Sequence, residues 1–289
     1  MSKYLTIPRI SFNNANAQPA WWCIAAPGPS AFAGLAHALA RATGFLNQYN
    51  PIATVWHDWA LRAETPSGWM VHPHQYRSAS LVNKDDYVGS SMALSGQPTV
   101  RGDGAVSLIL ALDDEERVDL NLVDDFLRRA RIAGGAIVEH RFDPSGAHIY
   151  DSWSDAKHAI RTGFSLQPRP DLMAAVDEAD KRDPLDRFLD ATRRMKETAE
   201  EKRVRAEEEP ATDSWLTPYV AGWLSVTDAK HRNLTREGVA HAFAEPLIGL
   251  GQFVSLRKAS PCFFRYTRLD PRTVVLESSS PERKVVKPT

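Results

Sequence analysis

Residues 4–12 have the sequence Tyr-Leu-Thr-Ile-Pro-Arg-Ile-Ser-Phe, and residues 13–17 continue with Asn-Asn-Ala-Asn-Ala. Strand-tolerant apolar residues dominate the first segment, so residues 3–12 are predicted to form a strand whose pairing Pro8 limits on one side. The carboxamides that follow donate and accept hydrogen bonds in one plane, which suits a folded loop or contact with a base edge. From these residues alone, a hydrogen-bonded loop before the first helix is favoured.

The next element is predicted to be a helix over residues 30–43. Ser30 is a candidate N-cap, Gly44 can end the helix, and one face is apolar, with Phe32, Leu35, Ala36 and Leu39. His37 and Arg41 lie four residues apart and therefore on the same side. The helix start follows Pro-Gly-Pro at residues 27–29, so its free amide groups are predicted to bind a phosphate or simply to be capped, with equal weight.

Further strands and a helix complete the first half. Strands are predicted over residues 51–63, 105–112 and 136–142, and a helix is predicted to begin at Asn121 and to end at Gly134-Gly135. The order strand, helix, strand, strand, helix, strand is that of the ferredoxin-like fold, which RNA-recognition modules also use. The predicted class is therefore α+β, with a ferredoxin-like core in residues 1–150.

Residues 64–104 are predicted to form a long β-hairpin insertion in this core, with Gly102-Asp103-Gly104 as a turn. Arg77, Lys84 and Arg101 occur here together with Tyr76 and His74. Basic and aromatic side chains in such a mixture suit single-stranded RNA, which stacks its bases on rings and places its phosphates on cations.

The second half has a different pattern. Residues 151–214 are predicted to be a mostly solvated helical insertion, residues 215–277 to be strands and loops that pack on the core, and residues 278–289 to be a flexible tail. In the second helix of the insertion, Leu185, Phe188, Leu189 and Met195 form a narrow apolar stripe.

Composition restricts the function further. The chain has 35 basic and 36 acidic residues and a net charge of -1, so any RNA contact must be made by a local patch. The two cysteines, Cys23 and Cys262, lie far apart in the sequence, which favours buried free thiols over a metal site. We find no motif for a cofactor and no long apolar run, and we expect a cytoplasmic protein without cofactor or metal.

The chain resembles the Csy-type second subunit of the type I-F CRISPR surveillance complex, a guide-binding member of the RAMP superfamily. The first block of resemblance consists of Ile7-Pro8-Arg9, residues 13–17 and residues 29–39. The second consists of residues 215–218, Gly222 and residues 244–251. Residues 55–58, 83–85 and 133–135 fall between these blocks in the expected order.

This resemblance implies a non-catalytic subunit that binds the 5′ handle of the guide RNA. It also implies a large subunit and a repeated backbone subunit as partners, with target DNA contacted indirectly through the guide. A glycine-rich loop of related proteins touches RNA at the place of Gly134-Gly135, although the full multi-glycine pattern is absent here. The predicted RNA-binding residues are Asn13, Asn14, Asn16, Ser30, His37, Arg41, Arg77, Lys84, Arg101, Arg128, Arg131, Gly134 and Gly135.

Two alternatives remain open at this stage. His37 or His57 could serve a metal-independent ribonuclease, although adjacent residues such as His57 and Asp58 on a strand face opposite sides. The helical insertion could instead contact the DNA duplex beside the recognition motif, as in compact relatives of the complex. For Arg128 and Arg131, favourable charge at a helix C-terminus explains the residues as well as phosphate binding does.

Overall fold

The computed structural model describes residues 3–20, 22–44, 50–66, 71–79, 96–113, 116–174, 181–194, 215–231 and 238–279. The helices are α1 (Pro29–Thr43), α2 (Leu120–Leu127), α3 (Trp153–Ile160), the 3-10 helix η2 (Pro170–Met173) and α4 (Pro184–Arg194). The strands are β1 (Lys3–Asn16), β2 (Ile52–Leu61), β3 (Ala63–Glu64), β4 (His72–Pro73), β5 (Gln75–Ala79), β6 (Gly96–Leu112), β7 (Arg131–Ile132), β8 (Gly135–His140), β9 (Ile149–Tyr150), β10 (Phe164–Pro168), β11 (Leu216–Ser225), β12 (Ala244–Ser255), β13 (Phe263–Arg268) and β14 (Thr273–Ser279).

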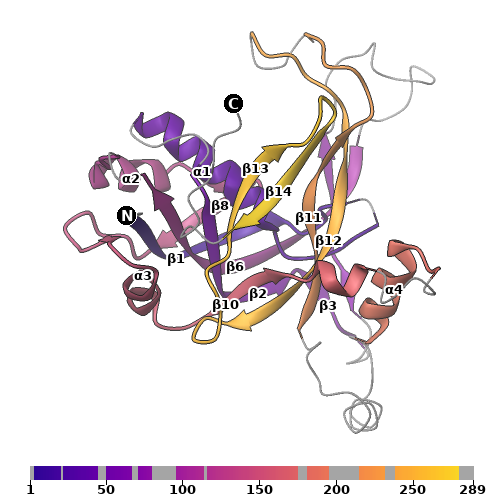
Figure 1. The fold of residues 1–289 in the computed structure, drawn as a ribbon, viewed down its shortest axis with the longest axis horizontal. Helices are drawn as coiled ribbons and strands as arrows, with labels where there is room; N and C mark the ends of the chain where they lie inside the picture. Colours follow the sequence, from indigo (N-terminus) through magenta and orange to yellow (C-terminus); the bar gives the residue numbers. More distant parts are fainter. Residues whose placement is uncertain are drawn as a thin grey trace, which may run out of the picture.

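A large antiparallel sheet organises these elements (Figure 1). Its centre has the order β2-β6-β1-β8, and every pairing in this centre is antiparallel. The sheet continues from β8 to β7 on one side and from β2 to the C-terminal strands on the other. The predicted α+β class is thus confirmed, at the level of a mixed fold with a large antiparallel sheet.

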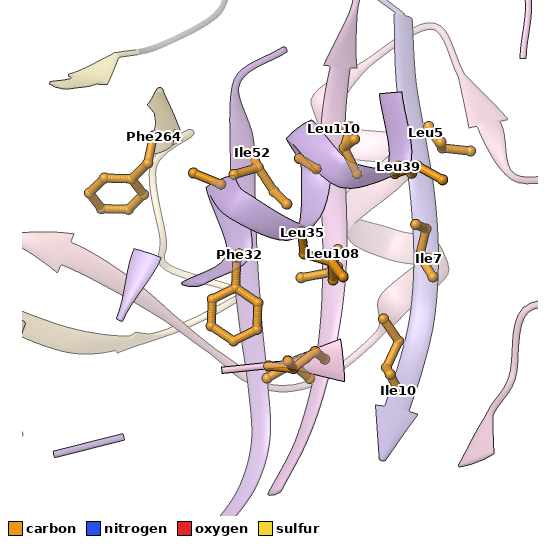
Figure 2. Close-up of a cluster of buried hydrophobic side chains, with 14 of the residues drawn as sticks. Leu5, Ile7, Ile10, Phe32, Leu35, Leu39, Ile52, Leu108, Leu110 and Phe264 are labelled. Atoms are coloured by element: carbon orange, nitrogen blue, oxygen red, sulfur yellow. The ribbon is translucent and has the colours of Figure 1, made fainter. Parts of the chain in front are cut away.

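One face of the central strands carries α1 and α2 and buries the main core (Figure 2). Leu5, Ile7 and Ile10 of β1 alternate with residues of the opposite face, as the two-residue period of a strand requires. They pack with Leu35 and Leu39 of α1, together with Phe32, Leu108, Leu110, Ile52 and Phe264. The apolar helix face that the sequence predicted is therefore confirmed.

The opposite face of the same strands is covered in part by α3. Trp153, Ala156 and Ile160 of this helix pack with a second set of strand residues, namely Tyr4, Ala53, Val55, Ile109 and Ala111. β1, β2 and β6 are consequently buried on both faces over this part of their length. This explains the unbroken apolar run at the end of β6, which alternation alone would not require.

The C-terminal strands extend the sheet. β10 pairs with both β12 and β2, and the path β10-β12-β11-β14-β13-β2 returns to its start. These strands thus form a closed ring of pairings that shares β2 with the centre. The range 151–214, predicted as a helical insertion, therefore also supplies a strand of the main sheet, whereas the domain boundaries stay a prediction.

α4 lies beside the ring and packs through one side. Phe188 and Ala191 are buried with Leu216 and Leu250, and η2 contributes Leu172 and Met173. The predicted stripe is only partly confirmed, because Leu185 and Leu189 are exposed. Met195 lies outside the described residues.

The boundaries of two strands differ from the predictions. β1 runs on to Asn16, so the predicted loop after residue 12 is a strand, and β6 starts at Gly96, so the insertion does not reach residue 104. Gly102 and Gly104 are strand residues rather than a turn: a Cβ on Gly102 would lie 2.4 Å from the ring of Trp59. The glycines thus let an indole lie against the strand. β5 pairs antiparallel with the first part of β6, as a hairpin insertion requires.

Both cysteines are buried free thiols, as predicted, and burial raises the pKa of Cys23 to about 11 and that of Cys262 to about 12. No helix in the described part of the chain is both long and apolar enough to cross a membrane.

Replacement of Phe32 by alanine tests the core under α1. The ring of Phe32 is fully buried and packs edge to face with Trp56, with the ring centroids 5.7 Å apart. We therefore expect Phe32→Ala to lower the free energy of unfolding by about 3–5 kcal/mol. Arg41→Ala, an exposed position on the same helix, should change it by no more than about 0.5 kcal/mol. Urea denaturation followed by far-UV circular dichroism measures both, and equal losses would contradict this packing.

Candidate nucleic-acid interface

The asparagine-rich end of β1 contains a β-bulge centred on Asn14. The register against β6 shifts between Phe12 and Ala15, and Asn14 has a left-handed φ of 59°. Its backbone N–H donates to Oδ1 of Asp103 at 2.7 Å. Asparagine tolerates this conformation better than most residues, and a bulge turns the extra residue out of the ladder. Asn14 is exposed, and its carboxamide makes no hydrogen bond within the described residues.

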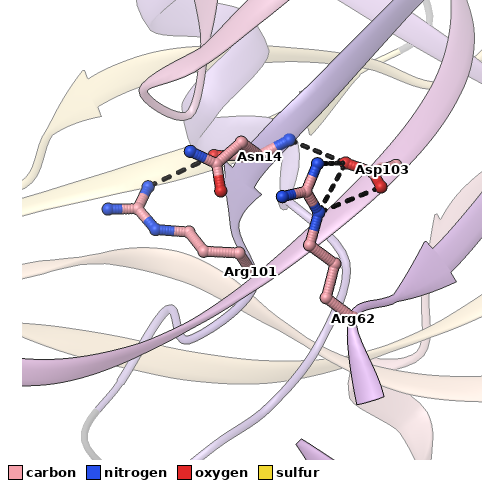
Figure 3. A network of polar contacts seen from close by, with 4 residues as sticks. All are labelled: Asn14, Arg62, Arg101 and Asp103. Atoms are coloured by element: carbon pink, nitrogen blue, oxygen red, sulfur yellow. Dashed lines mark hydrogen bonds and ion pairs between the residues drawn. The ribbon is translucent and has the colours of Figure 1, made fainter. Parts of the chain in front are cut away.

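Asp103 of β6 connects this bulge to the end of β2 (Figure 3). Arg62 donates through Nε and Nη2 to both carboxylate oxygens, at 2.9–3.1 Å. Burial opposes ionisation of Asp103, but the hydrogen bonds from Arg62 and Asn14 and the positive charge of Arg62 outweigh it. The pKa of Asp103 therefore lies below its ordinary value, and the carboxylate holds Asn14 and Arg62 in place at neutral pH.

Two arginines border the same bulge from neighbouring strands. Arg101 of β6 donates through Nη1 to the carbonyl of Asn14 at 3.3 Å, and Arg131 of β7 donates through Nη1 to the carbonyl of Gly134 at 3.2 Å. No carboxylate among the described residues forms an ion pair with either guanidinium. Since a guanidinium has five N–H donors, each arginine keeps most of its donors for another partner.

A tight hairpin loop brings Gly134 to this place. Ala133 and Gly134 both have positive φ, 48° and 78°, and they connect the paired residues Ile132 and Gly135. This is the two-residue loop whose twist suits a hairpin. The predicted role of the glycines as the end of a helix is wrong, because α2 already ends at Leu127.

Gly135 has a packing role that the sequence did not reveal. A Cβ at this position would lie 2.5 Å from the carbonyl oxygen of Asn13 and 2.7 Å from the amide of Ala15. The absence of a side chain is what lets β8 approach the bulge of β1. Asn13 itself lies opposite Ala136 of β8 and is half-buried.

Asn16 is used inside the protein. Its side chain accepts from the amide of Gln18 at 3.1 Å and donates to the carbonyl of Gln18 at 3.2 Å. Its backbone N–H donates to Ala133 at 2.9 Å, which ties β1 to the hairpin loop. The Asn16 side chain is therefore hydrogen-bonded within the protein, and its predicted contact with RNA stays a prediction.

We call the residues gathered here the Asn14 cluster: Asn13, Asn14, Arg62, Arg101, Asp103, Arg131, Gly134 and Gly135. Sequence analysis had selected six of them from three separated segments, and it missed Arg62 and Asp103. The only signal for the pair was Gly102-Asp103-Gly104, an acidic residue between two glycines, which resembles a turn unless the neighbouring strand is known.

The predicted contacts on α1 do not join this cluster. Figure 2 shows Leu39 beside Leu5, at the start of β1, so Arg41 in the last turn lies at the far end of the strand from Asn14. Ser30 is not the N-cap: that residue is Gly28, which has no side-chain cap and lies against Tyr219 and Val220. With residues 27–29 buried, the helix start is no open phosphate site. His37 is half-buried.

Arg128 also lies elsewhere, in a polar group between α2 and β8. It binds Asp124 through Nε and Nη2 at 3.0 and 2.9 Å, and His140 lies 3.6 Å from the other carboxylate oxygen. A local carboxylate thus already balances the charge of Arg128. Arg77 belongs to β5, but its side chain and the whole of Lys84 lie outside the described residues.

The contacts of His57 give little support to a catalytic role. Nε2 of His57 lies 2.6 Å from Oγ of Ser107, and no hydrogen bond joins His57 to Asp58 within the described residues. Burial, followed by the positive charges of Arg9 and Arg141, lowers the pKa of His57, so the imidazole is neutral at neutral pH. No group of three metal-ligating side chains occurs among the residues that the structure describes.

Comparison with known proteins adds one finding. A family model described as CRISPR-associated protein (Cas_Csy2) matches residues 5–267, which include most of β1, the complete Asn14 cluster and most of the C-terminal strands. No curated protein matches the chain.

Substitution of the two hairpin glycines separates close packing from loop conformation. Gly135→Ala should lower the free energy of unfolding by about 1–3 kcal/mol, because the new Cβ would collide with the backbone of β1. Gly134→Asn should cost no more than about 0.5 kcal/mol, since asparagine tolerates positive φ and the nearest atom lies 3.7 Å away. Urea denaturation compares the two variants, and a tolerated Gly135→Ala would contradict the close approach of β8.

Proposed function

Because the chain belongs to the Csy2 family of CRISPR-associated proteins, we propose that it is a non-catalytic subunit of a type I-F surveillance complex that holds the 5′ handle of the guide RNA. Family membership by itself indicates a subunit of a Cascade-type complex. The proposal that the chain binds the 5′ handle rests on the Asn14 cluster. There, two arginines without carboxylate partners among the described residues border an exposed asparagine and a glycine hairpin.

The fold of the first half supports RNA binding. If β1, β2, β6 and β8 are numbered one to four, the strand order in space is four, one, three, two, and α1 and α2 lie on one face. We infer a ferredoxin-like core from this order, the arrangement that RNA-recognition modules use. The additional strands of the ring and α3 are then additions to that core.

The chemistry of the cluster suits a single-stranded backbone. Arg101 and Arg131 are each fixed by one hydrogen bond to a main-chain carbonyl, which reduces the entropy lost when the remaining donors bind a phosphate. Gly134 has no side chain, so a phosphodiester can approach the hairpin backbone. The free carboxamide of Asn14 can donate to and accept from a base edge, which would supply selectivity.

Asp103 would repel a phosphate if its charge were uncompensated. The two-donor contact from Arg62 neutralises it, and the carboxylate serves as a positioning group that keeps Asn14 in its bulge. The net charge of -1 agrees with such a design, in which local geometry rather than the overall field of the protein attracts RNA.

Partners would contact surfaces away from the cluster. Leu224, Val226 and Leu269 are 41%, 54% and 64% exposed and lie near one another at one end of the β11, β13 and β14 strands. Exposed apolar side chains in a group fit contact with another subunit, and we propose the large subunit and the repeated backbone subunit as candidates. Target DNA would be recognised by pairing with the guide.

Removal of the two cluster arginines tests RNA binding. In Arg101→Gln/Arg131→Gln, the affinity of the full chain for a labelled oligoribonucleotide with the handle sequence should fall at least tenfold at physiological salt. Because each lost phosphate contact removes about 0.7 from the slope of log K against log salt, the slope should decrease in magnitude by about 1.4. Fluorescence anisotropy over a salt series measures both quantities.

The matched control is Arg257→Gln/Lys258→Gln, which removes two exposed charges from the turn after β12. It should bind the oligoribonucleotide like the wild type. Unchanged affinity and slope in the Arg101→Gln/Arg131→Gln variant would overturn the assignment of the site.

Incubation with precursor repeat RNA in EDTA separates binding from the ribonuclease alternative. We expect intact RNA, because His57 is bonded to Ser107 and, within the described residues, no carboxylate or second histidine forms a hydrogen bond with its ring. Gel analysis that shows cleavage, lost in His57→Ala or His37→Ala, would replace the binding assignment. The DNA-contact alternative depended on the region 193–205, where positions 195–205 and the side chains of Arg193 and Arg194 lie outside the described residues.

A further inference from the structure

β1 contains a second bulge, centred on Arg9, on the sheet face that carries α3. The register against β6 shifts between Ile7 and Ile10, and Arg9 has a left-handed φ of 41°. Its backbone N–H leaves the ladder and donates to Oγ of Ser107 at 2.9 Å. Arginine has no intrinsic preference for this conformation, so the bulge presents Arg9 at the expense of local backbone energy.

Arg141, the residue after β8, is bonded to the same bulge. Its backbone N–H lies 3.3 Å from the carbonyl oxygens of both Pro8 and Arg9. The two arginines therefore leave the backbone from adjacent positions on neighbouring strands. Both side chains are exposed.

His57 lies beside the same bulge, because its ring and the backbone N–H of Arg9 both contact Oγ of Ser107. β2 has its own register shift between Trp56 and Asp58, which leaves His57 as the extra residue facing Ser107. The positive charges of Arg9 and Arg141 both act on this imidazole and lower its pKa, after burial, which is the larger cause. The neutral ring adds a hydrogen-bonding group but no third positive charge.

No counter-charge is bound to this pair. Within the described residues, neither Arg9 nor Arg141 forms an ion pair or a side-chain hydrogen bond. Other arginines of the protein do: Arg62 binds Asp103, Arg128 binds Asp124 and Arg265 binds Glu277. Glu139 and Asp58 are exposed near the two arginines but bind neither. Two like charges without a carboxylate partner disfavour a purely structural role and favour an anionic ligand.

The pair and the Asn14 cluster share one strand and one open part of the sheet face. Ser11 pairs with both Glu139 and Ala105, so its side chain faces away from the α1 core and lies between Arg9 and Asn13. α3 packs on Tyr4, Ile109 and Ala111 near the start of β1, whereas Arg9 and Asn14 are exposed and Ser11 and Asn13 are half-buried. Four residues separate Arg9 from Asn14, and the five residue steps between them span about 15 Å, more than one extended nucleotide covers.

We propose that Arg9 and Arg141 form a second phosphate-binding point, so that single-stranded RNA crosses the open sheet face along β1 from the Asn14 cluster to His57. This inference rests on the proposed function and extends its site. It assigns the exposed half of the sheet, which the sequence did not select, as the path of the guide handle.

A length series of RNA probes tests the second point. The variant is Arg9→Gln/Arg141→Gln, and the probes are a labelled oligoribonucleotide with the whole handle sequence and two versions shortened by three nucleotides, one at each end. For the whole handle, the variant should bind at least fivefold more weakly, and its salt slope should be smaller in magnitude by about 1.4. For one of the shortened probes, wild type and variant should bind equally, because that probe no longer reaches Arg9.

Further variants exclude simpler explanations. Arg9→Lys/Arg141→Lys should keep the wild-type slope, since the charges remain, and Arg257→Gln/Lys258→Gln should bind all three probes normally. Equal thermal unfolding temperatures for all variants show that folding is intact. If the Arg9→Gln/Arg141→Gln variant is less stable, the Arg9→Lys/Arg141→Lys variant and the dependence on probe length still show whether the two arginines bind phosphate.

The outcomes for the two sites are distinct. If the wild type binds the handle and loses affinity only in Arg101→Gln/Arg131→Gln, the second point is overturned while the proposed function stands; an acidic protein segment would then be the ligand of Arg9 and Arg141. If the wild type binds none of the probes, the proposed function and the second phosphate-binding point are both overturned. Loss of affinity in each double variant, with different dependence on probe length, supports both.

Discussion

The register of β1 against β6 is the constraint on which the rest of the structure depends. Both strands are buried on two faces near the start of β1, with the α1 core on one side and α3 on the other. A slip by one residue would exchange these faces and place residues such as Ser107 in the main core. The register is therefore set strongly where apolar residues are packed, and the two bulges occur where one face is open.

The bulges release residues of β1 from this register on the surface that we propose binds RNA. Each of them releases one residue of β1 from the ladder, Arg9 in one case and Asn14 in the other, and each is held by a side chain of β6. Ser107 and Asp103 accept the released N–H groups, so neither of these two donors is left unpaired. Polar residues along one edge of a buried strand thus acquire fixed positions without a separate loop, and a rigid platform of this kind limits the entropy lost on binding.

Electrostatics at this surface is local. The chain as a whole is nearly neutral, but the open face combines Arg9, Arg101, Arg131 and Arg141 with few bound carboxylates. Asp103 is the exception, and an ion pair with Arg62 balances its charge. A subunit within a larger ribonucleoprotein does not need a long-range field to find its ligand. In the proposed RNA complex, contacts that position a phosphate backbone would be sufficient, while selectivity for the handle would come from groups such as the Asn14 carboxamide.

The sequence by itself determined the mixed α+β class, the apolar face of α1, the free cysteines and the family to which the chain belongs. Each of these depends on local periodicity, composition or short motifs, which adjacent residues encode. Asn14 and Gly134 were also selected from local signals, because a carboxamide suits a base edge and a glycine lets a phosphodiester approach the backbone. The structure adds that both residues have positive φ.

Only the tertiary structure decided which of these residues meet. Asp103 lies 89 positions from Asn14 in the chain, and Arg141 reaches Arg9 across more than a hundred positions, so no local pattern reports either contact. Contacts between distant segments also place Arg41 away from the cluster. They make residues 102–104 part of a strand, because Trp59 on the neighbouring strand occupies the space that side chains at the two glycines would need. Pairing between distant strands, and the bulges that adjust it, depends on the packing of the complete sheet rather than on any one segment.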